Sequence, residues 1–306
     1  MNIKQSIKKI LACATASAMT LCLTMPTAFA DDTTNNAKEA YISKTYNTEV
    51  GKAETFSFTA TQVTGEGLVS NQVSPKMPSI SFTADETGTK TKRDKITFPA
   101  FSQEGKYEYT VTESQTANPT VKNNEHEKMI MSQAEYKMDV YVSNNNNKYE
   151  ITKIIVNKTK DDKGNDATGK VDIGNSDTNG FSFTNTYVQE AGTGTDPTNP
   201  GEDYEKYGSL KVTKTVNPNG GTIDKDASFS FTAKFNFPKE TDANTLGNVK
   251  GNNIEIELEN GEYGFNLKHG ESMTFTGLPV GTTMTVSESN TPNYKGSASY
   301  VINGGE

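Results

Sequence analysis

The sequence predicts an all-β protein built of tandem immunoglobulin-like β-sandwich domains, the second of them cut short. Short runs of alternating apolar and polar residues are separated by Gly, Asn and Pro turns, a pattern typical of many short strands. No run keeps a helical period over several turns. The pentapeptide FSFTA at 56–60 recurs unchanged at 229–233, which indicates a duplicated domain.

The N-terminus predicts export. An apolar stretch at 10–23 is followed by a small-x-small cleavage site at 28–30, so residues 1–30 are expected to be a removed signal peptide. Three lysines form its basic start: Lys4, Lys8 and Lys9. The apolar stretch is too short to span a membrane. The full chain has a net charge of −8, and the signal carries three Lys and no acid, so the mature charge is −8 − 3 = −11. This charge argues against a nucleic-acid partner and suits a soluble surface protein.

Both cysteines, Cys13 and Cys22, lie inside the predicted signal peptide. The mature protein therefore has no disulfide, although export would take it to a compartment that permits one. Another covalent cross-link would serve the same purpose. A lipoprotein signal is the weaker alternative, because Cys13 follows few apolar residues and Cys22 lacks a small residue before it.

The mature chain divides by composition. Residues 31–39 are expected to be a disordered lead-in, and 40–188 a first sandwich domain. The segment 189–207 is rich in Gly, Thr, Pro and acidic residues, which predicts a linker. A second, incomplete sandwich domain is expected over 208–306.

Three polar residues of the first domain fall in phase with apolar neighbours. Lys44 alternates with Ile42 and Tyr46, Glu113 follows Tyr107, Tyr109 and Val111, and Asn185 lies between Phe183 and Tyr187. Side chains alternate faces along a strand, so all three should point into the core. Each residue alone is more often a structural one, because a lone Lys snorkels to water and a lone Asn marks a turn.

Buried together, these three groups can react. Burial favours the neutral amine and the neutral carboxyl, and a neutral amine is a nucleophile. The Lys44 amine would attack the Asn185 amide carbon and release ammonia. Glu113 would donate a hydrogen bond to the amide oxygen and relay protons. The product is an isopeptide bond between two strands, formed once per molecule, so the chain is not expected to be an enzyme.

The second domain repeats two of these residues. Lys214 is in phase with Val212 and Val216, and Glu288 with Met284 and Val286. The Lys-to-Glu separations are 113 − 44 = 69 and 288 − 214 = 74 residues. Asn185 follows Lys44 by 185 − 44 = 141 residues, and the same distance from Lys214 reaches 355, beyond residue 306. Asn303 comes too early to be the counterpart.

Two turns predict hairpins. The run 254–259 alternates up to Asn260-Gly261, after which Tyr263, Phe265 and Leu267 alternate again, which predicts a hairpin. Four asparagines at 144–147 are expected to form a hairpin tip.

The chain resembles the T-antigen-type backbone pilins of Gram-positive sortase-assembled pili, which contain isopeptide-linkage domains. The segment GKYEYTVTE at 105–113 looks like that family's G-x-Y-x-Y-x-V-T-E strand, and FTN at 183–185 like its closing F-x-N strand. In the second domain, LKHGES at 267–272 and LPVG at 278–281 resemble further family segments.

The resemblance implies roles for the phased residues. Lys44 would be the amine donor, Asn185 the acceptor and Glu113 the catalytic acid and base, with Lys214 and Glu288 in the same roles in the second domain. The family's pilin-linking lysine precedes the closing strand. Lys170 lies in that region, but no motif selects it over its neighbours Lys158, Lys160 and Lys163.

The function expected from this resemblance is a structural subunit of a pilus on the cell surface or wall of a Gram-positive bacterium. Its partners would be other pilin subunits and a sortase, and no cofactor or metal is expected. No sorting signal of the L-P-x-T-G type is found up to residue 306. A non-polymerising adhesin or stalk that binds a host ligand is the alternative.

An exported enzyme is a third class, which the residues disfavour. The only two histidines, His126 and His269, have no metal-ligand partner at useful spacing and are expected at the surface. The acidic glycine loop 161–166 lacks the full pattern of a Ca²⁺ loop and is expected to be a solvated turn.

Overall fold

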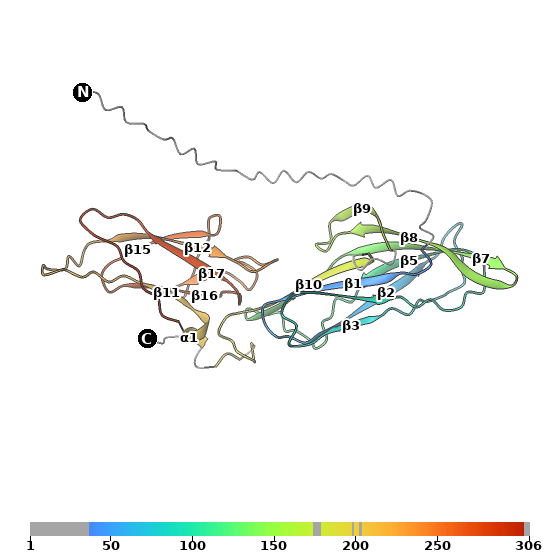
Figure 1. Ribbon diagram of the computed structural model, residues 1–306, viewed down its shortest axis with the longest axis horizontal. Coiled ribbons are helices and arrows are strands. Elements are labelled where there is room, and N and C mark those ends of the chain that lie inside the picture. The colour runs from blue at the N-terminus through green and yellow to red at the C-terminus, as the bar shows by residue number, and fades with distance from the viewer. Residues whose placement is uncertain (1–36, 174–178, 198, 202–203, 303–306) are drawn as a thin grey trace, which may run out of the picture. The chain divides into compact units, whose positions relative to one another are not determined.

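The computed structural model describes residues 37–173, 179–197, 199–201 and 204–302 (Figure 1). The predicted signal peptide, most of the predicted lead-in and Asn303 lie outside these residues. Nearly all the regular structure is β-strand, which confirms the predicted fold class. The described residues include no helix long and apolar enough to cross a membrane.

The first of two sheets in the N-terminal half has the order β4-β1-β10-β6. Its strands are β4 (Gly88–Lys95), β1 (Tyr41–Thr48), β10 (Phe181–Gln189) and β6 (Glu127–Ile130). β1 and β10 pair in parallel, with Lys44 opposite Phe183 and Tyr46 opposite Asn185. The first and last strands of this half therefore lie side by side (Figure 1).

The second sheet has the order β3-β2-β5-β7-β8-β9. Its strands are β3 (Ser79–Phe82), β2 (Glu54–Val63), β5 (Gly105–Glu113), β7 (Glu135–Asn145), β8 (Lys148–Lys160) and β9 (Asp166–Val171). β7 and β8 meet at a turn in which Asn146 and Asn147 both have positive φ, 52° and 64°. Such a turn matches the right-handed twist of the strands, and the predicted hairpin tip is confirmed.

Alternation along the strands places one face of each sheet in a shared core. On β5, Tyr107, Tyr109 and Val111 are fully buried, and the residues between them are partly exposed. Aromatic side chains from both sheets meet in this core, such as Phe58 and Phe183 with ring centroids 5.1 Å apart. The two sheets thus form a β-sandwich around one cluster of buried residues that runs from Ala40 to Tyr187.

The predicted lead-in is wrong at its end. The backbone carbonyl of Ala37 accepts a hydrogen bond from Ile154 N at 2.9 Å, and Ala37 packs against the core. Glu39 binds Lys95 at 2.5 Å and accepts a hydrogen bond from Tyr41 at 2.8 Å. These contacts fix 37–39 to the sandwich, because an apolar side chain and a paired backbone group favour order over solvation.

The C-terminal half has its own core, from Val216 to Leu278. One sheet has the order β11-β16-β13-β14, and the other has the order β15-β12-β17. The strands are β11 (Leu210–Thr213), β16 (Ser272–Thr276), β13 (Lys250–Gly251), β14 (Ile254–Glu255), β15 (Glu262–Leu267), β12 (Phe229–Asn236) and β17 (Thr283–Glu288). A five-residue helix, α1 (Tyr204–Gly208), begins within the predicted linker.

The second predicted hairpin is only partly correct. Asn260 and Gly261 form a tight turn with φ of 53° and 80°, closed by Glu259 N to Glu262 O and Glu262 N to Glu259 O at 2.9 Å each. The strand before it ends at Glu255, however, and β15 pairs with β12 instead. Phe265 stacks on Phe231 with centroids 5.5 Å apart, so burial of aromatic rings across β12 decides the pairing.

Candidate functional site

The sandwich buries the Lys44 side chain completely. Lys44 is in the middle of β1 and is 0% exposed. Its Nζ lies 2.6 Å from Glu113 Oε1 and 4.3 Å from the ring centroid of Phe56. Beyond this contact with Glu113, Nζ has no hydrogen-bond partner among the described residues. This amine is therefore held in place by packing and charge.

Glu113 is the last residue of β5 and is 4% exposed. Its Oε1 lies 2.6 Å from Lys44 Nζ and accepts a hydrogen bond from Asn185 Nδ2 at 3.1 Å. One carboxyl oxygen therefore touches both nitrogens of the predicted reaction. Oε2 is buried and has no hydrogen-bond partner within the described residues.

Asn185 lies on β10, two residues beyond the position opposite Lys44. Diagonal neighbours across a strand pair are within reach of a long side chain. Asn185 is 0% exposed, and its Oδ1 accepts a hydrogen bond from the backbone N–H of Ser132 at 2.7 Å. The sequence-based expectation that Glu113 donates to this oxygen is wrong in this structure, because Glu113 faces the amide nitrogen and Ser132 faces the oxygen.

Burial shifts the pKa values of both partners. Loss of solvation lowers the pKa of the Lys44 amine from 10.5 to about 8, and the charge of Glu113 opposes this shift. Loss of solvation also raises the pKa of the Glu113 carboxyl from 4.5 to about 7, opposed by Lys44. Both shifts favour the uncharged forms, in which the amine is nucleophilic and the carboxyl can donate a proton.

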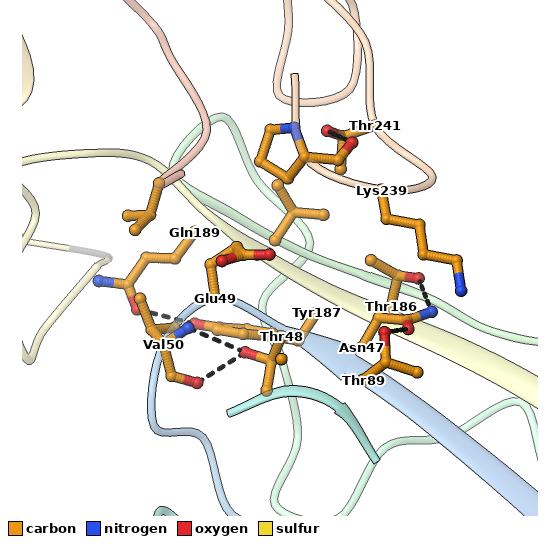
Figure 2. A pocket seen from close by; sticks show the side chains of 14 residues that line it. Asn47, Thr48, Glu49, Val50, Thr89, Thr186, Tyr187, Gln189, Lys239 and Thr241 are labelled. Atoms are coloured by element: carbon orange, nitrogen blue, oxygen red, sulfur yellow. Dashed lines mark hydrogen bonds between the residues drawn. The ribbon is translucent and has the colours of Figure 1, made fainter. Parts of the chain in front are cut away.

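Polar contacts near the end of β1 join this strand to its two neighbours, β10 and β4. Figure 2 shows Asn47 between Thr186 and Thr89. Asn47 Nδ2 donates to Thr186 Oγ1 at 3.2 Å, and Thr89 Oγ1 donates to Asn47 Oδ1 at 2.7 Å. A slip of one residue would turn Lys44 and Asn185 to opposite faces, so this network helps keep them together.

Two residues at the site were missed by sequence reasoning. Ser132 follows β6 in an irregular segment, and Asp162 belongs to the acidic loop 161–166. Asp162 Oδ1 accepts hydrogen bonds from Ser132 Oγ at 2.6 Å and from Thr184 N at 2.8 Å. The only sequence feature that marks either residue is the acidic loop 161–166. Its composition suggests a calcium site and gives no sign that Asp162 binds β10.

The remaining loop contacts agree with a solvated turn. Asp161 Oδ1 accepts hydrogen bonds from Lys163 N and Asn165 N, both at 2.9 Å. No cluster of three potential metal ligands occurs in the part of the chain that the structure describes. The histidines are half-buried rather than at the surface, because each has a partner: His126 Nδ1 lies 2.5 Å from Glu190 Oε2, and His269 Nδ1 accepts from Val216 N at 2.9 Å.

Lys214 and Glu288 also lie together. Lys214 Nζ donates to Glu288 Oε1 at 2.5 Å and lies 3.9 Å from the ring centroid of Phe229. The arrangement repeats that of Lys44, Glu113 and Phe56, since Phe56 and Phe229 begin the duplicated pentapeptide. The second pair is more open, with side-chain exposures of 12% and 26% against 0% for each partner of the first pair.

The open side of the second pair coincides with a sheet edge. Within the described residues, β11 pairs with β16 alone, whereas β1 lies between β4 and β10. No strand in the described part of the C-terminal half occupies the place that β10 has beside β1. Lys214 thus has a carboxyl partner without an amide opposite it among these residues.

The four candidate pilin-linking lysines differ in their surroundings. Lys158 lies 3.8 Å from Asp162 and over the ring of Tyr136 at 5.5 Å, and Lys160 lies 3.5 Å from Glu135. Lys163 and Lys170 are exposed, and Lys170 is on β9, the edge strand of its sheet. Lys163 and Lys170 are therefore the more accessible amines of the four.

Comparison with protein families assigns both halves of the chain. Residues 40–188 match the family described as "Spy0128-like isopeptide containing domain", and residues 208–305 match a domain of unknown function, DUF7601. The first match covers the whole sandwich that holds Lys44, Glu113 and Asn185 and confirms the resemblance seen in its sequence. A search of curated proteins found no match.

Among solved structures, the chain is similar to major pilins from Streptococcus pyogenes. One is 20% identical, with 83% of each chain covered and a TM-score of 0.36. The T3.2 pilin is 23% identical over 84% of each chain with a TM-score of 0.35, and the T-13 pilin is 17% identical over 88% of this chain and 92% of that one, with a TM-score of 0.34.

Proposed function

We propose that this chain is a structural subunit of a cell-surface pilus, stabilised by a self-formed bond between Lys44 and Asn185, since residues 40–188 match the family described as "Spy0128-like isopeptide containing domain". The observation that carries the proposal is the burial of an amine, a carboxyl and an amide in one contact set. A buried ion pair alone is weak evidence for stability, since its desolvation offsets its attraction. A reaction that consumes the Lys44 amine would explain why these three groups are buried together.

The geometry supports the chemistry. The neutral Lys44 amine attacks Asn185 Cγ, and Glu113 Oε1 lies beside both the attacking and the leaving nitrogen. A fold that holds the two reactants together converts a slow bimolecular step into an effectively intramolecular one. Ammonia leaves, and an amide joins β1 to β10.

The bond would connect the two ends of the domain. β1 is the first strand and β10 the last, and the two pair in parallel. Tension along a fibre enters one strand and leaves by the other. A covalent bridge between adjacent strands would carry this tension without loading the hydrogen bonds of the sheets.

Intact mass tests the proposal. The protein beginning at Asp31 should weigh one ammonia less than its sequence, and a tryptic digest should contain a branched peptide that joins Lys44 to Asn185. Glu113→Ala should restore the full mass. An unshifted mass in folded wild-type protein would refute the bond.

Polymerisation is a separate test. We propose Lys170 as the lysine that links one subunit to the next through a sortase, on the basis of its exposure on the edge strand β9. Wall extracts of the native host should then contain an SDS-resistant ladder recognised by antibody to this chain. A single wall-bound band in a strain that expresses its sortases would favour the adhesin or stalk function.

In the second half, we propose that Lys214 and Glu288 have the roles of Lys44 and Glu113. Their contact, and the aromatic ring under the amine, support this assignment. Their acceptor would be an asparagine on a strand added beside β11.

A further inference from the structure

The oxygen of the Asn185 amide has a partner outside the predicted set of three residues. Ser132 N donates to Asn185 Oδ1 at 2.7 Å. A backbone N–H can only donate, so the amide must present its oxygen to Ser132 and its nitrogen to Glu113. When an amine attacks an amide carbon, negative charge develops on this oxygen. A hydrogen-bond donor that already points at this oxygen stabilises the transition state without any rearrangement.

We infer that the backbone N–H of Ser132 is the oxyanion donor of the Lys44–Asn185 reaction, and that the Ser132 hydroxyl and Asp162 are positioning groups that hold it there. This inference rests on the proposed bond between Lys44 and Asn185.

Asp162 binds both Ser132, which donates to the Asn185 amide, and the residue before Asn185. Its Oδ1 accepts from Ser132 Oγ at 2.6 Å and from the backbone N–H of Thr184, the residue before Asn185, at 2.8 Å. Its carbonyl accepts from Gln133 N at 3.0 Å, and Ser132 Oγ accepts from Ala134 N at 3.2 Å. Hydrogen bonds to an ionised carboxylate are among the stronger ones in proteins.

These bonds matter because Ser132 is not held by a sheet. It lies between β6 and β7 in a segment without regular structure, yet it is only 1% exposed. A buried N–H in such a segment keeps its direction only through local contacts. Asp162 supplies two of them, and Gln115 Nε2 donates to the Ser132 carbonyl at 2.9 Å.

The reaction balances with the groups present. Lys44 Nζ, uncharged, forms a bond to Asn185 Cγ, and the carbonyl electron pair moves to Oδ1, where Ser132 N–H stabilises it. The protonated Glu113 gives its proton to Nδ2, the Cγ–Nδ2 bond breaks, and ammonia leaves as the carbonyl re-forms. Glu113 then takes the surplus proton from Nζ and returns to its starting state.

The test measures the rate of linking in the full chain. Samples from timed cell-free synthesis are denatured, and the linked fraction is read from intact mass. Ser132→Ala removes the hydroxyl that binds Asp162 and should slow linking about 10- to 100-fold, the range expected for a hydrogen bond to a charged group. Ser132→Thr retains a hydroxyl and should restore the rate. Ser182→Ala, at an exposed position of β10, is the matched control and should link as wild type does.

A second variant tests the N–H itself. An ester in place of the amide at residue 132, introduced with an α-hydroxy acid, removes the donor and should slow linking roughly 100- to 1,000-fold. The rate is measured across pH, because loss of an oxyanion donor lowers it at every pH without moving the profile. Asp162→Asn is less clean, since its charge also acts on Lys44 and Glu113.

The outcomes separate two failures. If wild-type protein never loses ammonia, the proposed bond fails and the inference falls with it. If wild type links and Glu113→Ala does not, but Ser132→Ala and the ester link at the wild-type rate, only the role of Ser132 and Asp162 is overturned. A slow Ser132→Ala protein that Ser132→Thr does not rescue would also overturn the positioning role.

Discussion

Replacing the acceptor should convert a linked domain into an unlinked one and reveal what the bond contributes. In Asn185→Ala, the Lys44–Glu113 pair stays intact, but no amide is available for attack. The link would close a loop of 185 − 44 = 141 residues. By the chain-entropy relation used for disulfides, such a loop contributes about 5 kcal/mol to the free energy of unfolding.

The variant loses a second, smaller contribution. The buried Ser132 N–H, which donates to Asn185 Oδ1 at 2.7 Å, is left without an acceptor, at a cost of about 1–3 kcal/mol. The expected loss is therefore roughly 6–8 kcal/mol. Glu113→Gln keeps the Ser132–Asn185 hydrogen bond, but it loses the link, about 5 kcal/mol, and leaves the buried Lys44 without a counter-charge, at about 3–5 kcal/mol, so its expected loss is roughly 8–10 kcal/mol.

The assay is guanidinium chloride unfolding of the full chain, monitored by hydrogen-exchange mass spectrometry so that unfolding of residues 40–188 is read separately from that of 208–302. Each sample is checked for linkage by intact mass, and Ser182→Ala should stay within about 0.5 kcal/mol of wild type. A linked wild type and an unlinked Asn185→Ala that differ by less than about 2 kcal/mol would refute the loop-entropy reasoning.

Three further predictions follow from the same contacts. The linking rate should have a bell-shaped pH profile, set by the pKa values of about 7 for Glu113 and about 8 for Lys44. Below this range the amine is protonated and cannot attack, and above it the carboxyl has lost the proton that it must donate. A rate that keeps rising above pH 8 would contradict this scheme. The 306-residue chain should lose one ammonia and not two, because no amide lies opposite Lys214 in the described residues. Hydrogen exchange should also be slower in 40–188 than in 208–302. Loss of two ammonias would show that the second acceptor is already present. Lys170→Ala should abolish the SDS-resistant ladder in the native host while Lys163→Ala, an exposed control in the same region, preserves it, and the reverse result would assign the linking role to Lys163.

The period of two was sufficient to predict that the three residues proposed to react are buried. Lys44, Glu113 and Asn185 were identified because each interrupts an apolar face, and each proves to be at most 4% exposed. Ser132 and Asp162 could not be found this way, since both lie in irregular segments where no period exists. The partner of β15 was also beyond the sequence pattern, because a turn fixes only its nearest residues whereas ring contacts with Phe231 form across distant strands.

The two Lys–Glu pairs show why the closing strand controls the chemistry. In the first half, β10 supplies Asn185, covers the other side of β1, and through Phe183 adds an aromatic ring that contacts Phe58 and Tyr136. In the second half, Lys214 has the same carboxyl and ring neighbours, yet its side chain and that of Glu288 are reached by solvent. The acceptor and the exclusion of water therefore come from one element. The amine of the first half can lose its charge and meet its amide only once β10 has docked, so the proposed bond would form on the folded domain and join its last strand covalently to its first.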